Sequence, residues 1–275
     1  MPTSIDRYHT PPRWPTTRML PLMGGLLGGC LSQTVLEDVD GADAWRSVPL
    51  DDASAVAITE AFAQELSTFD ADASLDDRNG TPPLLTQADV DEVINPGRDV
   101  EGLEAFWVTH FSEHPIDRHV DHYILIEDVT PVSPTATSYI RTIIDGDADA
   151  FRGGDGSQIT VRNDIERRAL FFDFSYEFLK TYRWVTLTDG TEAIISRGWL
   201  PESVSGEQGA NVLHQTYEAE MWIPEGTGTR RYYVQWTEAE YSVLSTTAAR
   251  NLTLRTGADG MVDLDIYISE RENER

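Results

Sequence analysis

The stretch that decides the fold is LHQTYEAEMWIPEGTGTRRYYVQWTEAEYSV, residues 213–243. Two sets of side chains alternate in its first half, namely Leu213, Tyr217, Ala219, Met221 and Ile223 against Thr216, Glu218 and Glu220. An alternation of period two is typical of a half-buried β-strand. The glycine-rich segment Pro224–Thr229 joins this run to a second one, Arg230–Val243. The stretch therefore predicts a hairpin of two long antiparallel strands.

Further strands are predicted on both sides of this hairpin, because the runs are rich in β-branched and aromatic residues. They are Tyr123–Val129, Ser138–Ile144, Gln158–Arg162, Ala169–Phe178, Thr181–Leu187, Glu192–Ser196 and, as a last strand, Val262–Ile268. Asp189-Gly190 lies between two of these runs and predicts a tight hairpin turn. Consecutive antiparallel strands with one wet face predict a meander that forms an open or half-closed barrel.

Helices are predicted mainly within residues 51–115. Apolar side chains recur there at helical spacing: Val56, Ile58, Phe62 and Leu66 after Asp52, and Leu103, Phe106, Trp107 and Phe111 within residues 100–114. Between them, Thr86 predicts a helix N-cap with Asp89 in the first turn. Pro115 should end the third helix, and Ser245–Arg255 predicts a short helix packed on the sheet. The predicted fold class is α+β, with residues 51–115 and the β domain 116–275 in one globular unit.

The N-terminal segment RMLPLMGGLLGGC, residues 18–30, ends in the only cysteine of the chain. Arg7, Arg13 and Arg18 precede a short apolar run, and Gly28 and Gly29 precede Cys30. This order of charge, apolar run and small residues is the layout of a secretory signal. The apolar run of about nine residues is too short to cross a bilayer, which takes about 20. At the end of the segment, Leu27-Gly28-Gly29-Cys30 resembles the lipobox of bacterial lipoproteins.

The resemblance implies that Cys30 carries a diacylglycerol and that residues 1–29 are a signal peptide removed before it. It also implies a cell-envelope location, with the membrane as partner through the lipid anchor. Leu31 follows the cysteine, which under the enteric sorting rule implies the outer membrane rather than the inner one. Residues 30–50 are acidic and lack a period, which predicts a flexible tether between the anchor and the folded part.

The chain is strongly acidic. Its formal net charge is −26, or −28 without residues 1–29, which contain Arg7, Arg13, Arg18 and Asp6. Such a surface repels nucleic acid and anionic membranes, so nucleic acid is not expected as a partner. Lys180 is the only lysine among 21 basic residues. With one cysteine, the chain can form neither an internal disulfide nor a zinc–thiolate framework.

A histidine-rich segment is the strongest candidate for chemistry: His110, Glu113, His114, His119 and His122 fall within 13 residues. His110-x-x-Glu113-His114 matches the inverzincin pattern, in which two histidines one helical turn apart bind zinc and the glutamate polarises a water. His119 or His122 could supply a third ligand. The alternative is a helix end, where histidine favours the negative dipole, followed by a solvated loop. Pro115 favours this alternative, because it stops the helix that would support the ligands.

A second candidate metal site begins at Asp145. Asp145, Asp147, Asp149 and Asp155 are spaced like the start of a calcium loop, but glycine is missing at the sixth position and glutamate at the twelfth. The alternative is a hairpin loop in a salt-adapted, acidic protein.

The residues suggest no nucleophile motif and no bound cofactor. Aromatic side chains are frequent in the β region and could line a cavity for an apolar ligand or fill an ordinary sheet core. We therefore consider three functions. The first is a lipid-anchored, non-enzymatic envelope protein that binds an apolar small molecule, a lipid or another envelope protein. The second is a metal-dependent hydrolase using His110, Glu113 and His114. The third is a structural surface lipoprotein without a ligand.

Overall fold

One nine-stranded antiparallel sheet organises the chain, with strands in the order β1-β2-β9-β8-β6-β5-β4-β3 and β7 paired to β8. The strands are β1 Asn79–Gly80, β2 Glu104–Ser112, β3 Ala136–Asp145, β4 Gln158–Ala169, β5 Phe172–Thr186, β6 Glu192–Trp199, β7 Val204–Ser205, β8 Asn211–Glu225 and β9 Gly228–Tyr241. The sheet is open, with β1 and β3 at its edges. The predicted α+β class and open antiparallel sheet are confirmed.

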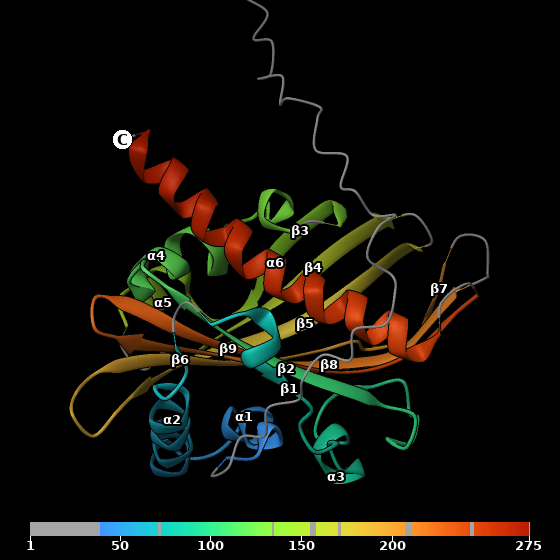
Figure 1. The fold of residues 1–275 in the computed structure, drawn as a ribbon, viewed down its shortest axis with the longest axis horizontal. Coiled ribbons are helices and arrows are strands. Elements are labelled where there is room, and N and C mark those ends of the chain that lie inside the picture. Colours follow the sequence, from blue (N-terminus) through green and yellow to red (C-terminus); the bar gives the residue numbers. More distant parts are fainter. Residues whose placement is uncertain are drawn as a thin grey trace, which may run out of the picture. The chain divides into compact units, whose positions relative to one another are not determined.

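The computed structural model describes residues 39–70, 73–133, 135–154, 158–169, 172–206, 211–242 and 245–274, all in one unit of the chain. The helices are α1 Gly41–Ser47, α2 Asp52–Leu66, α3 Gln87–Val90, α4 Ile116–His119, α5 Ala148–Arg152 and α6 Thr246–Asn273, with 3₁₀ turns at Leu75–Asp77 and Thr130–Val132 and a π-helical segment at Val120–Ile124. Helix α6 crosses one face of the sheet, and α1 and α2 pack on the other (Figure 1). Among the described helices, none is both long and apolar enough to span a membrane.

The hairpin at residues 213–243 is confirmed as β8 and β9. Trp236 lies opposite Tyr217, and Tyr233 lies opposite Glu220. The turn contains Gly226 at φ 61°, and the predicted β5–β6 hairpin contains Gly190 at φ 86°. Glycine suits both turns because it has no Cβ to clash in the left-handed region. The two long strands form the centre of the sheet.

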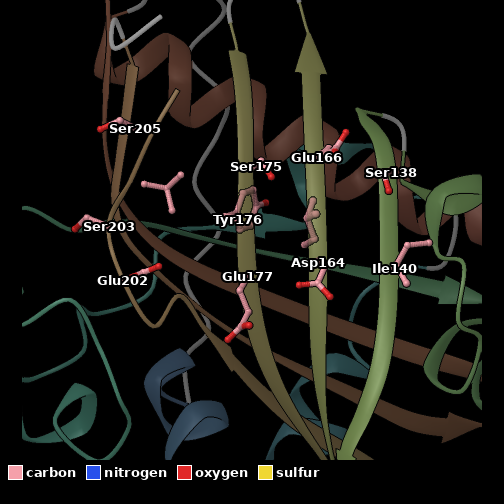
Figure 2. A pocket seen from close by; sticks show the side chains of 12 residues that line it. Ser138, Ile140, Asp164, Glu166, Ser175, Tyr176, Glu177, Glu202, Ser203 and Ser205 are labelled. Carbon is pink, nitrogen blue, oxygen red and sulfur yellow. The ribbon is translucent and has the colours of Figure 1, made fainter. Parts of the chain in front are cut away.

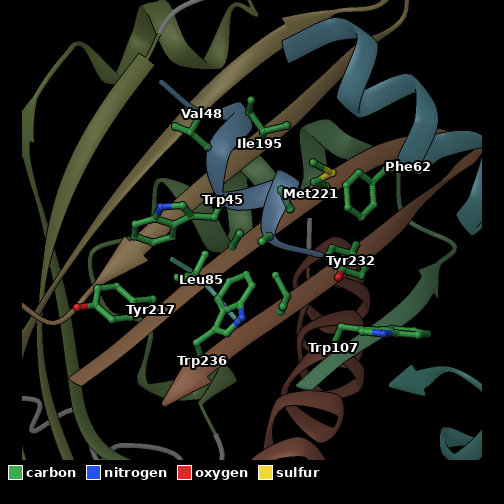
Figure 3. Close-up of a cluster of buried hydrophobic side chains, with 14 of the residues drawn as sticks. Trp45, Val48, Phe62, Leu85, Trp107, Ile195, Tyr217, Met221, Tyr232 and Trp236 are labelled. Carbon is green, nitrogen blue, oxygen red and sulfur yellow. The ribbon is translucent and has the colours of Figure 1, made fainter. Parts of the chain in front are cut away.

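Helix α1 corrects the predicted tether. Asp40 caps the helix by accepting a hydrogen bond from the backbone of Ala42, and Trp45 is 0% exposed. The indole of Trp45 donates to the backbone carbonyl of Asp89 at 3.2 Å and packs edge-on against Tyr217 (Figure 3). Residues 40–48 are thus part of the core. Residues 1–38, with the predicted signal peptide and Cys30, lie outside the described residues.

Strand β2 replaces the helix predicted for residues 100–114. Phe106 and His110 face α6, whereas Trp107 packs against Phe69 and Tyr232 on the opposite face. Both faces of this strand are covered, so apolar residues occur on both and no alternation is visible. A short apolar run of this kind cannot be distinguished from a helix by its period. Its β-branched and aromatic content was the better signal.

The segment after β2 is helical rather than extended. Pro115 is the N-cap of α4, which continues into the π-helical segment, so the strand predicted at Tyr123–Val129 is absent. Proline is well tolerated at a helix start, because the first backbone N–H groups have no partner inside the helix. Val120 and Ile124 are four residues apart, and both are buried against side chains of the sheet such as Trp222. Pro115 begins a helix here; it does not end one.

Helix α6 is a single element of 28 residues, where a short helix and a strand at Val262–Ile268 were predicted. Its buried side chains recur at helical spacing: Leu254, Ala258, Met261, Leu264 and Ile268. Gly257 and Gly260 each cost a helix about 1 kcal/mol relative to alanine. Burial of the large side chains offsets this cost, at about 1.5–3 kcal/mol each. The two strands predicted between residues 169 and 187 are likewise one strand, β5.

Candidate functional site

One sheet face is covered by α6 and by the π-helical segment with α5, and it has an apolar region at each end with polar side chains between them. The first region contains Val129, Val132, Tyr139, Ile165, Phe174, Phe178, Leu200, Leu213, Leu264 and Ile268. The second contains Val120, Ile124, Phe151, Ile159, Val161, Tyr182, Trp184, Ile194 and Trp222. Between them runs what we call the charged band: Arg141 on β3, Asn163 on β4, Lys180 on β5, and Glu218 and Glu220 on β8. All of these positions except Glu218 are almost fully buried.

Lys180 is the centre of the charged band. Its Nζ donates to Oε1 of Glu218 and to Oε1 of Glu220, both at 2.6 Å, and the side chain is 1% exposed. Burial alone would lower the pKa of Lys180, but the two carboxylates outweigh it and hold the pKa well above its ordinary value. Lys180 is therefore a charged ammonium and cannot act as a nucleophile near neutral pH.

Arg141 binds the segment that covers the band. Its guanidinium donates to the backbone carbonyls of Tyr123 and Ile124, the latter at 2.9 Å, and to the side chain of Asn163 at 2.8 Å. These carbonyls belong to the end of the π-helical segment, where a cation is favoured by the helix dipole. No described carboxylate lies within ion-pair distance of Arg141.

Four side chains beside Lys180 carry unpaired donors. The hydroxyls of Tyr182 and Ser196, the indole nitrogen of Trp222, and Nε and Nη1 of Arg231 are buried and have no hydrogen-bond partner among the described residues. Tyr182 pairs with Ser196 across β5 and β6, and Trp222 with Arg231 across β8 and β9. An unpaired buried donor costs about 1–3 kcal/mol. Such atoms concentrated on adjacent strands indicate a site that a ligand can complete.

The unpaired donors surround one aromatic surface. The rings of Tyr182 and Trp222 are 5.9 Å apart, and the Arg231 guanidinium lies 5.7 Å from the ring of Trp222 and 5.7 Å from that of Tyr123. Burial raises the pKa of Tyr182 to about 12, so its hydroxyl stays protonated and can donate. Only Nη2 of Arg231 approaches a carboxylate, at 3.6 Å from Glu220.

The histidines predicted as metal ligands contact α6. His110 Nε2 lies 2.8 Å from Oδ2 of Asp265, and its Nδ1 lies 3.0 Å from Nη1 of Arg78. Arginine can only donate, so Nδ1 accepts and Nε2 carries the proton that Asp265 accepts. Burial would raise the pKa of Asp265, but the hydrogen bond from His110 helps to keep it below its ordinary value.

Ser112 and His119 complete this contact. Ser112 donates to Oδ1 of Asp265 at 2.8 Å, so His119 Nε2, 3.1 Å from the same hydroxyl, must donate to it. Burial and the charge of Arg231 lower the pKa of His119 to about 3, which keeps the ring neutral. The arrangement is not a catalytic triad, because the serine proton is held by the carboxylate and the histidine faces the hydroxyl as a donor.

His114 adds a further contact to α6. Its Nε2 donates to the backbone carbonyl of Asp265 at 3.1 Å. We call His110, Ser112, His114, His119 and Asp265 the histidine clamp. Because it joins the end of β2 and α4 to the C-terminal half of α6, the clamp fixes that half of the helix on the sheet.

The predicted zinc geometry is not formed. His110 lies on a strand and Glu113 is exposed beyond its end, so the premise of two histidines on one helical turn is wrong. His122 packs edge-on against Tyr267 of α6. Within residues 39–274 as described, no three His, Cys, Asp or Glu side chains are grouped to hold a metal ion.

The predicted calcium loop also has another structure. Asp147 caps α5 by accepting from the backbone of Ala150, and Asp149 pairs with Arg152 at 2.8 Å. Asp145 ends β3, and Asp155 lies outside the described residues. The aspartates that the structure describes thus end a strand, cap a short helix and form a surface ion pair.

An open groove of about 480 Å³ lies on the sheet face away from α6 (Figure 2). Its carboxylates come from β4, β5 and the segment before β7: Asp164, Glu166, Glu177 and Glu202. Asp164 and Glu166 alternate with Ile165, which belongs to the covered face, so this groove is separate from the charged band. Its four carboxylates belong to the acidic surface of the chain.

The residues under α6 were not selected as a site from the sequence. The alternation in β8 correctly placed Glu218 and Glu220 on one face, but that face was predicted to be wet because it is polar. The signal that could have located the charged band is Lys180, because a lysine that occurs only once in an arginine-rich chain indicates that its position requires a lysine. Asp265 gave no signal, because it was placed in a predicted strand.

No protein-family model matches the chain, and no curated protein matches its sequence. Among solved structures, the chain is similar to the STAR-related lipid transfer protein from Xanthomonas axonopodis, at 12% identity and a TM-score of 0.43, over 63% of this chain and 97% of that one. It is also similar to human StAR-related lipid transfer protein 5, at 11% identity and a TM-score of 0.40, over 81% and 100%. The protein TTHA0849 from Thermus thermophilus matches at 14% identity and a TM-score of 0.38, over 60% and 97%. Similarity at this level assigns the chain to no family.

Proposed function

We propose that this protein is a lipid-anchored envelope protein that binds an apolar small molecule or lipid between the sheet and its helical cover. The observation that carries the proposal is the group of unpaired donors on an aromatic surface that the π-helical segment and α5 cover. Apolar side chains extend from these donors in both directions along the sheet. An apolar body beside a few placed polar groups is the composition of a small-molecule site.

Binding fits the charged groups better than catalysis does. Lys180 is neutralised by two carboxylates, and Ser112 already donates to Asp265. Neither Lys180 nor Ser112 is therefore a nucleophile beside a free base. The hydrolase hypothesis also loses its basis, since it required His110 and His114 on one helix.

Entry of a ligand requires the helical cover to move. Tyr182 and Trp222 pack with Val120 and Ile124 of the π-helical segment and with Phe151 of α5, so these elements must lift before a ligand can reach the unpaired donors. The histidine clamp fixes the C-terminal half of α6 through Asp265, so we expect the opening to be at the π-helical segment and α5. The expected motion is a hinge-like displacement of packed elements, on the μs–ms timescale of such motions.

The lipid anchor is proposed from Leu27-Gly28-Gly29-Cys30. One acyl chain holds a protein on a membrane only marginally, so stable attachment needs the several chains that bacterial lipoproteins carry. The test is phase partitioning in detergent: the wild type should enter the detergent phase, and Cys30→Ser should stay in water. Mass spectrometry that finds an intact Met1 on membrane-bound protein would exclude the anchor.

Ligand binding is tested with spin-labelled stearate, whose nitroxide quenches tryptophan only at short range. The protein is the full chain carrying Cys30→Ser, so that no lipid is attached. Saturable quenching is expected to fall in Trp222→Phe, because Trp222 lies in the proposed site beneath the π-helical segment. The matched control is Trp236→Phe, an equally buried tryptophan on the opposite face, which should retain the quenching. No saturable quenching, or a loss in Trp236→Phe alone, would overturn the proposed site.

A further inference from the structure

Arg231 is the cation on the covered sheet face whose hydrogen-bond donors are left without partners. The cations that surround the shared aromatic rings are Lys180, Arg141 and Arg231, whereas the carboxylates in contact with them are those of Glu218 and Glu220 alone. Both carboxylates are bound by Lys180. Asp265 keeps its negative charge, because His110 and Ser112 donate to it as neutral groups, and this charge also acts on Arg231. Among the described residues, however, no group accepts a hydrogen bond from Nε or Nη1 of Arg231.

The unpaired donors supply hydrogen bonds for a negatively charged group. Arg231 offers Nε and Nη1, and Trp222 offers its indole N–H. The hydroxyls of Tyr182 and Ser196 face the same side of the sheet, since they are register partners on adjacent strands. Three of the groups, the guanidinium, the indole and the Tyr182 phenol, are in ring contact with one another through Trp222. Donors outnumber acceptors here, and this favours an acceptor-only ligand group.

We infer that Arg231, Trp222, Tyr182 and Ser196 bind the acidic end of an anionic amphiphile, so that the protein selects ligands with a carboxylate or phosphate on an apolar chain. This inference rests on the proposed binding between the sheet and its helical cover. An anion on Arg231 would occupy the guanidinium edge that Glu220 leaves open, since Glu220 approaches only Nη2. Charge-assisted bonds of this kind are about twice as strong as neutral ones.

The apolar regions on either side of the charged band would hold the chain of the ligand. One contains Phe174, Phe178 and Leu264, and the other contains Trp184 and Ile194. The second lies directly beside the unpaired donors, because Ile194 and Trp222 are register partners. We therefore place the apolar chain along the second region, with its acidic end at Arg231.

The test compares oleate, oleyl phosphate and oleyl alcohol, which share one apolar chain. The protein is the full chain with Cys30→Ser, and dissociation constants are measured by competition with spin-labelled stearate. Oleate or oleyl phosphate should bind at least about tenfold more tightly than the alcohol. The stronger of the two identifies the acidic group as carboxylate or phosphate. Equal binding of all three would overturn the inference and leave the proposed function intact, whereas no binding of any would overturn both.

Variants separate recognition from folding. Arg231→Gln should remove the preference for the acidic ligands, whereas Arg197→Gln, the same change on the face that packs α1, should retain it. Tyr182→Phe is the sharper variant, because it deletes a hydroxyl that has no partner. Its thermal stability should be unchanged or higher, while the affinity for the favoured acidic ligand falls about tenfold. Unchanged affinity in both Arg231→Gln and Tyr182→Phe would overturn the assignment of these residues.

Discussion

Replacing Lys180 by methionine is the most direct test of the charged band. The substitution keeps most of the side-chain volume and removes the charge that holds Glu218 and Glu220 together. Glu220 is 4% exposed, so its charge would remain in the interior without its main partner. Breaking a buried ion pair from one side costs about 3–5 kcal/mol.

The structure places the expected cost near the lower end of that range. Arg231 lies 3.6 Å from the other oxygen of Glu220 and can compensate for part of the loss. Glu218 also accepts a hydrogen bond from Tyr233 at 3.2 Å. We expect Lys180→Met to lose about 3 kcal/mol of unfolding free energy. For a folded unit of this size that corresponds to a drop of about 6–12 °C in Tm.

The assay is urea unfolding at several pH values. Without their cation, the buried carboxylate of Glu220 and the half-buried carboxylate of Glu218 resist ionisation. The deficit relative to the wild type should then be largest above pH 7 and shrink toward pH 5, where the folded variant can bind the proton. The control is Lys180→Met with Glu218→Gln and Glu220→Gln, which removes all three charges and should recover most of the loss. A deficit below about 1 kcal/mol at pH 7.5, or one independent of pH, would refute the reasoning.

Three further predictions concern other parts of the fold. Burial keeps the pKa of His119 at about 3 in the folded state, against an ordinary value of 6.5, so the unfolded chain binds a proton first as the pH falls. The wild type should therefore lose about 3 kcal/mol of unfolding free energy between pH 7 and pH 4 from this group. His119→Gln keeps a donor for Ser112 and should reduce this loss at low pH, measured by urea unfolding. Trp45→Ala should cost about 3–5 kcal/mol, and a chain starting at Asp51 should melt well below the full chain, whereas equal melting temperatures would restore the tether hypothesis. Asp265→Ala should cost about 3 kcal/mol and speed amide exchange in the C-terminal half of α6 by mass spectrometry, and unchanged exchange there would show that the clamp does not hold the helix.

The sequence by itself determined the elements that local chemistry specifies. The alternation in residues 213–223 and the glycine at 226 located the central hairpin, because side-chain period and positive φ are properties of the nearest residues. The capping box at Thr86 and Asp89 located the start of α3 in the same way. The fold class followed from these elements together with the other strands.

Tertiary structure decided which faces are covered, and this is where the predictions failed. β2 shows no alternation because the sheet is covered on both sides, and α6 remains helical through Gly257 because its buried stripe offsets the cost of glycine. Residues 40–48 look like a tether in isolation, yet Trp45 finds a pocket formed by residues far along the chain. Burial depends on which distant segments meet, and a local pattern does not contain that information.

The candidate site shows the same division. Lys180 was visible as a single lysine, and Glu218 and Glu220 were correctly placed on one face of a strand. That this polar face lies under a helix, with three cations and unpaired donors gathered on it, follows only from the packing of α6 and the π-helical segment over the sheet. A polar strand face is wet in the absence of a cover, so the sequence predicted solvent where the fold placed its interior.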